Sequence, residues 1–121
     1  MKLELPPVDR TTLALYAGAS GDHNPLHIDL DAARNAGFDD VFTHGMLSMA
    51  YLGRLLTDLV PQQRIRSYQV RFTSITPVLA EPRCEASVAE VKDGLTHVDL
   101  VVSLQDGTVT LRGSAIIEGE L

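Results

Sequence analysis

The sequence predicts a single α+β domain in which an antiparallel β-sheet wraps around one long central helix. Two observations lead to this fold class. Apolar residues follow helical or irregular spacing over residues 10–60, whereas residues 64–118 alternate between apolar and polar in the manner of strands. The run that begins at Gly45 is apolar on nearly all sides, and a helix without a polar face is usually enclosed by other elements. We therefore expect the second half of the chain to enclose this helix.

The long helix is expected to begin near residues 43–45 and to run to Val60, because Pro61 cannot continue it. Its first turns carry the apolar residues Met46, Leu47, Met49, Ala50, Tyr51 and Leu52. Two shorter helices are expected before it. The first starts at residue 11 or 12 and stops at Gly18, and the second covers residues 32–35 after a capping aspartate at position 29 or 31.

The second half of the chain contains four alternating runs that predict strands. They cover residues 67–73, 84–88, 98–104 and 109–117. Asp93-Gly94 and Asp106-Gly107 lie between the later runs, and Asp-Gly between alternating segments is typical of β-hairpins. A short edge strand is expected over residues 3–5, before two prolines stop it. The strands are expected to form an antiparallel meander around the helix.

The composition limits the class of protein. The 121 residues, of which 45% are hydrophobic, suit one domain spanning residues 1–121. The formal net charge of −6 argues against nucleic-acid binding, and the two lysines cannot form a polybasic membrane patch. The lone Cys84 provides neither an intrachain disulfide nor a thiolate metal cluster. Because no run resembles a signal peptide or a membrane span, a cytoplasmic protein is expected.

One segment, residues 16–29, concentrates polar and conformationally special residues. Asp22 and His27 are five positions apart, and Pro25 between them breaks helical continuity. A bent loop can bring this carboxylate and this imidazole to one cavity, where they could bind and polarise one water molecule. Asp22 and Asn24 are equally typical of turns that close through their own backbone, so a purely structural role is the alternative.

A metal site is a further alternative for the histidines. His23 and His27 have i, i+4 spacing, and His44 could join them. Pro25 makes a regular helix between the first two unfavourable, and nothing else completes a ligand set, so we expect no metal. The nearby glycines lack the Lys-Ser/Thr or the third glycine of phosphate-binding and dinucleotide-binding loops, which excludes that class.

Residues 20–27 (Ser-Gly-Asp-His-Asn-Pro-Leu-His) closely resemble the signature of the MaoC-like dehydratases, also called R-specific enoyl-CoA hydratases. Residues 43–47 (Thr-His-Gly-Met-Leu) resemble a second mark of this family, and residues 70–73 (Val-Arg-Phe-Thr), followed by Pro77-Val78, resemble a weaker third. The resemblance covers nearly the whole chain. It implies the hot-dog fold, which is the architecture predicted above from periodicity.

The resemblance also implies a reaction: the reversible syn addition of water across the 2,3 double bond of a trans-2-enoyl thioester, which gives the (R)-3-hydroxyacyl product. Asp22 and His27 match the catalytic pair of the family, and the backbone N–H of Gly45 matches its oxyanion donor. Asn24 and His44 are expected to support the site rather than to react. The implied chemistry needs no metal and no organic cofactor, because the thioester itself activates the alkene.

The partners implied are an acyl-CoA or acyl-carrier-protein thioester as substrate and a second copy of the chain, since a homodimer is expected with the site near its interface. Arg64, Arg66 and Arg71 are candidates for holding coenzyme A phosphates in an acidic chain. Gly53 stands where some relatives carry a small polar residue near the site.

Two other functions compete with this one. The hot-dog fold also hosts acyl-CoA thioesterases, and a fold alone does not decide function. The chain could also be a non-catalytic partner subunit of a hetero-oligomeric dehydratase. The joint presence of Asp22, His27 and Gly45 argues against a purely structural subunit, which would need none of them.

Overall fold

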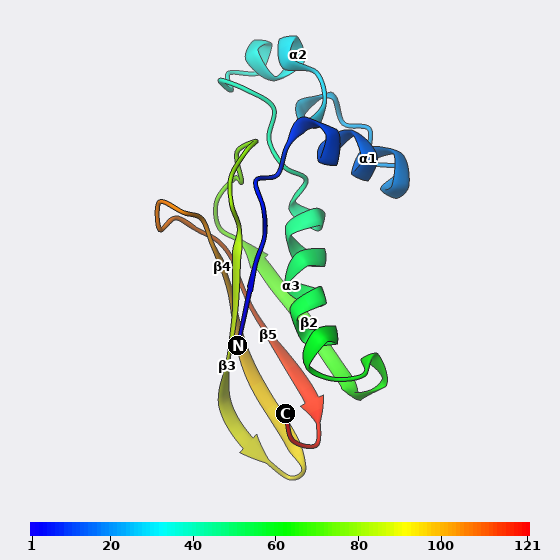
Figure 1. The fold of residues 1–121 in the computed structure, drawn as a ribbon, viewed down its shortest axis with the longest axis vertical. Coiled ribbons are helices and arrows are strands. Elements are labelled where there is room, and N and C mark those ends of the chain that lie inside the picture. Colours follow the sequence, from blue (N-terminus) through cyan, green and yellow to red (C-terminus); the bar gives the residue numbers. More distant parts are fainter.

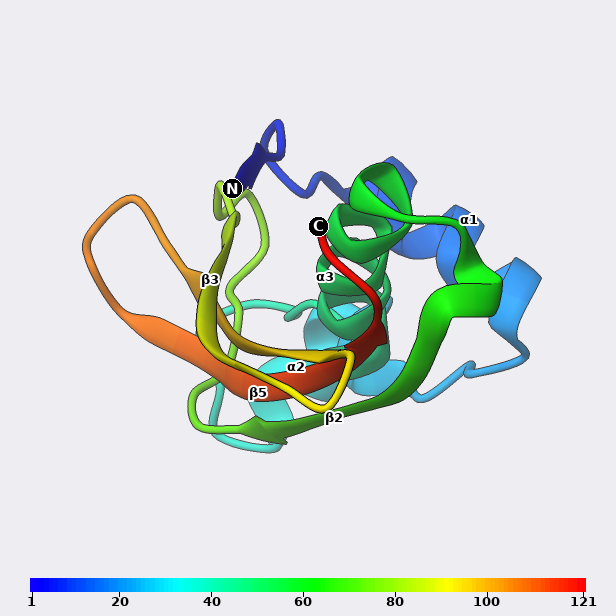
Figure 2. The same cartoon turned by 90° about the horizontal axis from the view of Figure 1, so that it is seen from below.

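The helix α3 (Gly45–Leu59) lies along the concave face of a five-stranded antiparallel sheet in the computed structural model, which describes all residues from 1 to 121 (Figure 1, Figure 2). Its leucines Leu52, Leu55 and Leu56 are at most 3% exposed and pack in the main core against the strands. The α+β class and the long central helix are therefore confirmed, with the helix bounds within one residue of the prediction.

The sheet is only partly the meander that was predicted. Its strands are β1 (Lys2–Glu4), β2 (Ile65–Phe72), β3 (Arg83–Lys92), β4 (Leu95–Ser103) and β5 (Val109–Glu118). The order is β1-β3-β4-β5-β2, so β3, β4 and β5 follow one another through the two Asp-Gly turns, whereas β2 pairs with β5. The connection over residues 73–82 contains no hairpin turn signal. It leads from β2 at one edge of the sheet to β3, which lies between β1 and β4 near the opposite edge.

A glycine allows β2 to approach β5 closely. A Cβ atom at Gly113 would lie 2.3 Å from the Gln69 carbonyl oxygen and 2.9 Å from Val70 Cγ1. On the same strand, the Tyr68 hydroxyl donates a hydrogen bond of 2.6 Å to the Met49 carbonyl in α3. The edge strand is thereby tied to the helix that it flanks.

The helix α1 (Arg10–Ser20) is longer than predicted. Asp9 caps it in place of a threonine, since its carboxylate accepts a hydrogen bond from the Thr12 N–H. The helix passes through Gly18, which costs only about 1 kcal/mol relative to alanine, so the predicted stop at this residue is wrong. It ends at Gly21, whose φ of 78° is in the left-handed region.

The helix α2 (Leu30–Asn35) begins after Asp29, whose carboxylate accepts from the N–H groups of Asp31 and Ala32, as one of the two predicted caps. Together with α1 it lies beyond the N-terminal end of α3 (Figure 1). A second core cluster joins these elements: Val8, Leu13, Ala33, Val41 and Leu47. This cluster fixes the loops between the helices at the start of α3.

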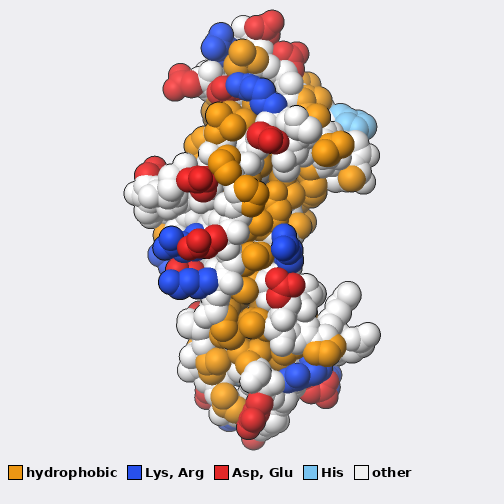
Figure 3. All heavy atoms as spheres, viewed as in Figure 1, with side chains coloured by type: hydrophobic (Ala, Val, Ile, Leu, Met, Phe, Trp, Pro, Cys, Tyr) orange, Lys and Arg blue, Asp and Glu red, His pale blue; other side chains and the backbone are white.

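The sheet does not enclose α3 on all sides, contrary to the expectation from its apolar sequence. Ala50 is exposed, and Met46 is 56% exposed. Figure 3 shows a band of hydrophobic side chains down the face on which α3 lies. None of the helices combines the length and the apolarity that are needed to cross a bilayer.

We predict that Gly113→Val destabilises the fold by at least about 2 kcal/mol, because the new side chain would overlap the Gln69 carbonyl. Thermal unfolding followed by circular dichroism should show a Tm lower by about 10 °C. Gly18→Ala is the matched control, since no neighbouring atom lies within 4 Å of its added Cβ, and its Tm should be kept or raised. An unchanged Tm for Gly113→Val would contradict the close approach of the strands.

Candidate active site

A chain of short turns shapes the loop that follows α1. Asp22 Oδ1 accepts a hydrogen bond of 3.2 Å from the Asn24 N–H, and Asn24 Oδ1 accepts one of 3.1 Å from the Leu26 N–H. The second bond caps a 3₁₀ turn over Pro25–His27. The turn-forming role considered for Asp22 and Asn24 is confirmed. It uses only one carboxylate oxygen of Asp22, so the other is free for a different task.

The free oxygen of Asp22 faces His27. Its Oδ2 atom lies 4.0 Å from His27 Nε2, and the two side chains are 48% and 10% exposed. His27 Nδ1 lies 2.7 Å from the Phe42 carbonyl oxygen, which can only accept, so Nδ1 carries the proton of the neutral ring. His27 Nε2 therefore presents a lone pair toward the carboxylate. Two acceptors at this separation leave room for a hydrogen-bond donor between them.

His44 contacts the backbone of the same loop. Its Nε2 lies 3.1 Å from the backbone oxygen of Asp22, to which it donates, and its ring stacks on His27 with centroids 4.0 Å apart. Tyr16 from α1 contacts the His44 ring edge-on, with centroids 4.8 Å apart. Burial lowers the pKa of His44 below its ordinary value, and the neighbouring His27 acts in the same direction. His44 is therefore a neutral, buried support for the Asp22 loop.

Gly45, directly after His44, is the first residue of α3. Its N–H has no backbone acceptor and lies at the positive end of the helix dipole. With Phe42, Thr43 and Phe72 it lines a cavity of about 320 Å³. A Cβ at this position would lie 3.0 Å from the Phe72 ring, so a glycine suits the close packing here. This N–H therefore has no hydrogen-bond partner in the backbone.

The ligand set considered for a metal is not the one that the fold assembles. Ligand atoms of Asp22, His27 and His44 lie within 4.8 Å of one another, whereas His23 is exposed and is not among them. The turn around Asn24 replaces the helix that i, i+4 spacing would require. The Asp22 carboxylate therefore takes the place of His23 in this group.

Three groups at the site were not identified from the sequence. The sequence pattern indicates only that Tyr16 is an apolar residue of the first helix. Its aromatic contact with His44 depends on how that helix packs. The Phe42 contribution is a backbone carbonyl, which no side-chain pattern reveals. Phe72 alternates like any strand residue, yet it covers Gly45.

The arginines proposed for coenzyme A phosphates have different surroundings. Arg64 donates to backbone carbonyls of the C-terminal segment, and Arg66 pairs with the Glu118 carboxylate at 3.0 Å. Arg71 has no ion-pair partner and lies opposite Arg112 in the β2–β5 pairing. Of the three candidates, Arg71 is the one whose guanidinium is not held within the chain.

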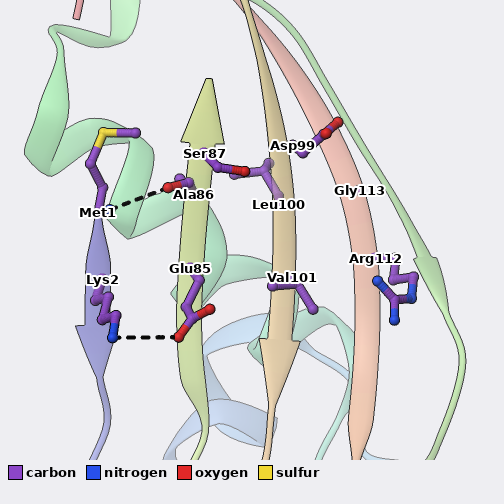
Figure 4. Close-up of a pocket in the computed structure, with 10 residues that line it drawn as sticks. All are labelled: Met1, Lys2, Glu85, Ala86, Ser87, Asp99, Leu100, Val101, Arg112 and Gly113. Atoms are coloured by element: carbon purple, nitrogen blue, oxygen red, sulfur yellow. Dashed lines mark hydrogen bonds and ion pairs between the residues drawn. The ribbon is translucent and has the colours of Figure 1, made fainter. Parts of the chain in front are cut away.

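A larger hollow, of about 420 Å³, lies on the outer face of the sheet, away from α3 (Figure 4). An ion pair of 3.9 Å between Lys2 and Glu85 crosses from β1 to β3 at its border. None of the residues that line it belongs to the Asp22 loop or to the start of α3. The lone Cys84 is buried in the main core, and this burial raises the pKa of its thiol to about 12.

An antiparallel sheet wrapped around one long helix defines the chain as a hot-dog protein, the fold that it shares with solved R-hydratases. The chain belongs to the MaoC-like domain family, whose model matches residues 3–108.

Curated relatives are about 30% identical to the chain over the aligned residues. It is 32% identical over 108 residues to 3-hydroxyacyl-thioester dehydratase Z of Mycobacterium tuberculosis, covering 84% of this chain and 70% of that protein. It is 28% identical over 113 residues to the (R)-specific enoyl-CoA hydratase of Rhodospirillum rubrum, covering 93% and 76%. A solved R-hydratase from Pseudomonas aeruginosa superposes with a TM-score of 0.85 at 27% identity, over 100% of this chain and 81% of that one.

We predict that the two stacked imidazoles hold opposite neutral tautomers, with the proton of His27 on Nδ1 and that of His44 on Nε2. Each ring donates to a backbone carbonyl through the named nitrogen. Long-range ¹H–¹⁵N correlation spectra at about pH 9, where histidine side chains are neutral, report the tautomer directly. His23, which is exposed, serves as the internal reference for a ring free to exchange. The same tautomer in both buried rings would contradict the arrangement.

Proposed function

We propose that the protein is a hydro-lyase that adds water reversibly across the 2,3 double bond of a trans-2-enoyl thioester and gives the (R)-3-hydroxyacyl thioester. Membership of the MaoC-like family and relatives named as a 3-hydroxyacyl-thioester dehydratase and an (R)-specific enoyl-CoA hydratase support this reaction class. The observation that carries the proposal is the Asp22–His27 pair, whose facing acceptor atoms lie 4.0 Å apart.

The spacing of the pair suits one water molecule. A water at about 2.8 Å from each acceptor can donate one hydrogen to Asp22 Oδ2 and the other to His27 Nε2. Both hydrogens of the water are then engaged, and its oxygen lone pairs are directed away from the pair toward a bound alkene. The turn at Asn24 and the Phe42 carbonyl hold the two acceptors in this orientation.

Hydration then proceeds on one face of the alkene. An O–H bond of the water breaks as its oxygen bonds to carbon 3, and the Asp22–His27 pair takes the proton. The pair returns a proton to carbon 2 as the C=C π bond is lost, so that the pair ends unchanged. Because the water and the proton donor lie on the same side of the substrate, the addition is syn. The two groups act as a coupled pair in this exchange.

The negative charge that develops on the thioester oxygen needs a fixed donor. We assign this to the N–H of Gly45, which has no backbone acceptor and is one of the residues that line the cavity with Phe42 and Phe72. The electron-withdrawing thioester supplies the activation of the alkene. The reaction as proposed needs no metal or organic cofactor, and coenzyme A or an acyl carrier protein enters as part of the substrate.

The thioesterase alternative is less well served by this geometry. Hydrolysis requires the water to attack the carbonyl carbon, whereas an enoyl group whose oxygen binds Gly45 places carbon 3 two bonds further along. If the chain were an inactive subunit, the facing acceptor atoms of Asp22 and His27 would have no function. Both alternatives are resolved by the products formed.

A homodimer is the second part of the proposal. The edge strand β1 has three residues, whereas β2 presents eight residues along the other edge of the sheet. Next to that edge Phe72 and Ile75 are 52% and 48% exposed, and Met46 on α3 is 56% exposed. Exposed apolar side chains beside a long free edge are a surface for a second copy of the chain. Pairing through β2 would cover them and close the cavity near Gly45.

We predict that the purified protein hydrates a short trans-2-enoyl-CoA, and that Asp22→Asn and His27→Gln each lower kcat/KM by about 10²- to 10⁴-fold. Asparagine can keep the turn through its own oxygen, so Asp22→Asn tests the charge rather than the fold. His23→Gln changes an exposed neighbour of the same loop and should leave the rate unchanged.

Chromatographic separation of the products decides between the functions. Formation of 3-hydroxyacyl-CoA supports the hydratase function. Release of free coenzyme A would instead identify the protein as a thioesterase. A full rate in both dyad variants would contradict the proposed chemistry. An inactive wild-type chain that gains activity on addition of a second protein would favour the partner-subunit role.

We predict that the protein is a dimer in solution and that Phe72→Lys shifts it toward the monomer, because a charge beside the β2 edge opposes burial. Light scattering coupled to size exclusion measures the mass. Val91→Lys is the matched control, since Val91 is a comparably exposed apolar residue, 62% exposed, on the remote β3–β4 hairpin. A wild-type monomer at micromolar concentration, or equal dissociation by both variants, would contradict the β2 interface.

A further inference from the structure

The site holds three side chains whose donor atoms are those of a transition-metal site. Asp22, His27 and His44 each offer one ligand atom, and these atoms lie within 4.8 Å of one another. Two imidazole nitrogens and one carboxylate oxygen are a donor set that Zn²⁺ and Co²⁺ accept, with a fourth position left to water. His23, the remaining histidine of this loop, points to solvent and is not needed.

One of the imidazoles already has the support that metal-binding histidines use. The Phe42 carbonyl accepts a hydrogen bond of 2.7 Å from His27 Nδ1 and so directs the Nε2 lone pair toward Asp22. Such a contact fixes both the tautomer and the orientation of a ligand. His27 would need no rearrangement of its own to bind a cation.

The other two ligands would move slightly. Asp22 Oδ2 lies 4.0 Å from His27 Nε2, whereas ligands about 2.0 Å from a tetrahedral ion are about 3.3 Å apart. The Asp22 side chain is 48% exposed and can rotate to close this gap. His44 would transfer its proton from Nε2 to Nδ1, a buried atom that has no hydrogen-bond partner. The other buried side-chain polar atoms without a partner are Thr43 Oγ1 and Ser48 Oγ.

From these observations we infer that Asp22, His27 and His44 form a divalent-cation site that takes Zn²⁺ or Co²⁺ and that switches the enzyme off when it is occupied. The cation would lie where the reacting water lies, between Asp22 Oδ2 and His27 Nε2. It would consume both lone pairs that hydration uses as proton acceptors. The binding stands on the geometry alone, and the inhibition rests on the proposed hydratase function.

Binding is tested with Co²⁺ alone as the probe, because its visible absorption reports a site of low coordination number. We expect one Co²⁺ per chain with intense visible bands, and displacement of the bands by Zn²⁺. Asp22→Asn and His44→Gln should each weaken Co²⁺ binding by more than about tenfold, and the control His23→Gln should not. Circular dichroism shows whether each variant is folded. If His44→Gln does not fold, Asp22→Asn still tests the site, because Asp22 lies on an exposed loop.

The result that overturns the site is equally specific. Absence of the visible bands in the wild-type protein, or equal Co²⁺ affinity in wild type and Asp22→Asn, would show that the three groups do not bind a cation together. Loss of the bands in His23→Gln would place the cation elsewhere.

Inhibition is tested separately, with the rate of enoyl-CoA hydration measured against added Zn²⁺. We expect the rate to fall over the same concentration range in which Zn²⁺ displaces Co²⁺, and to recover fully with EDTA. Binding without loss of rate would overturn the inhibitory role. If no enoyl thioester is hydrated at all, the hydratase proposal fails while the Co²⁺ spectra still decide the cation site.

Discussion

Burial of one face of α3 against the curled sheet holds the N-terminus of that helix in place, and the candidate site is assembled around this N-terminus. Each fully buried leucine of α3 contributes about 2 kcal/mol, so the helix has little freedom to shift. His44 and Gly45 stand at its first turn, one holding the Asp22 loop and the other presenting a free N–H. β2 also lies close to β5 at Gly113, and Phe72, the last residue of β2, lies against Gly45.

The parts of the fold with local signals were predictable. The apolar run of α3 and the proline after it placed the helix, and the two Asp-Gly turns placed β3, β4 and β5 in order. The partner of β2 was not predictable, because its choice depends on a long connection and on space around Gly113 that no strand pattern reveals. The length of α1 was missed because packing of the second core cluster outweighs the helix penalty of Gly18.

The site shows the same division. The spacing of Asp22 and His27 around Pro25 allowed the pair but left the turn-forming role open, and the family resemblance selected the two residues. The structure places their facing acceptor atoms 4.0 Å apart. The groups that orient them come from elsewhere in the chain: the Phe42 carbonyl and the Tyr16 ring. These contacts arise only once α1 and α3 are docked, so they have no signature in a single sequence. The metal alternative considered in the sequence included His23, which is exposed and lies outside the group that Asp22 forms with His27 and His44.

Two imidazoles stacked 4.0 Å apart pose a problem for proton transfer, since either ring could compete for the same proton. Burial resolves it by lowering the pKa of His44, and a charge on His27 would lower it further. His44 thus stays neutral, and in the proposed reaction His27, next to the half-exposed Asp22 carboxylate, is the ring that exchanges protons with the substrate. In this proposal His44 positions the loop and His27 takes part in the reaction. The difference between them lies in their surroundings, because the two side chains are chemically identical.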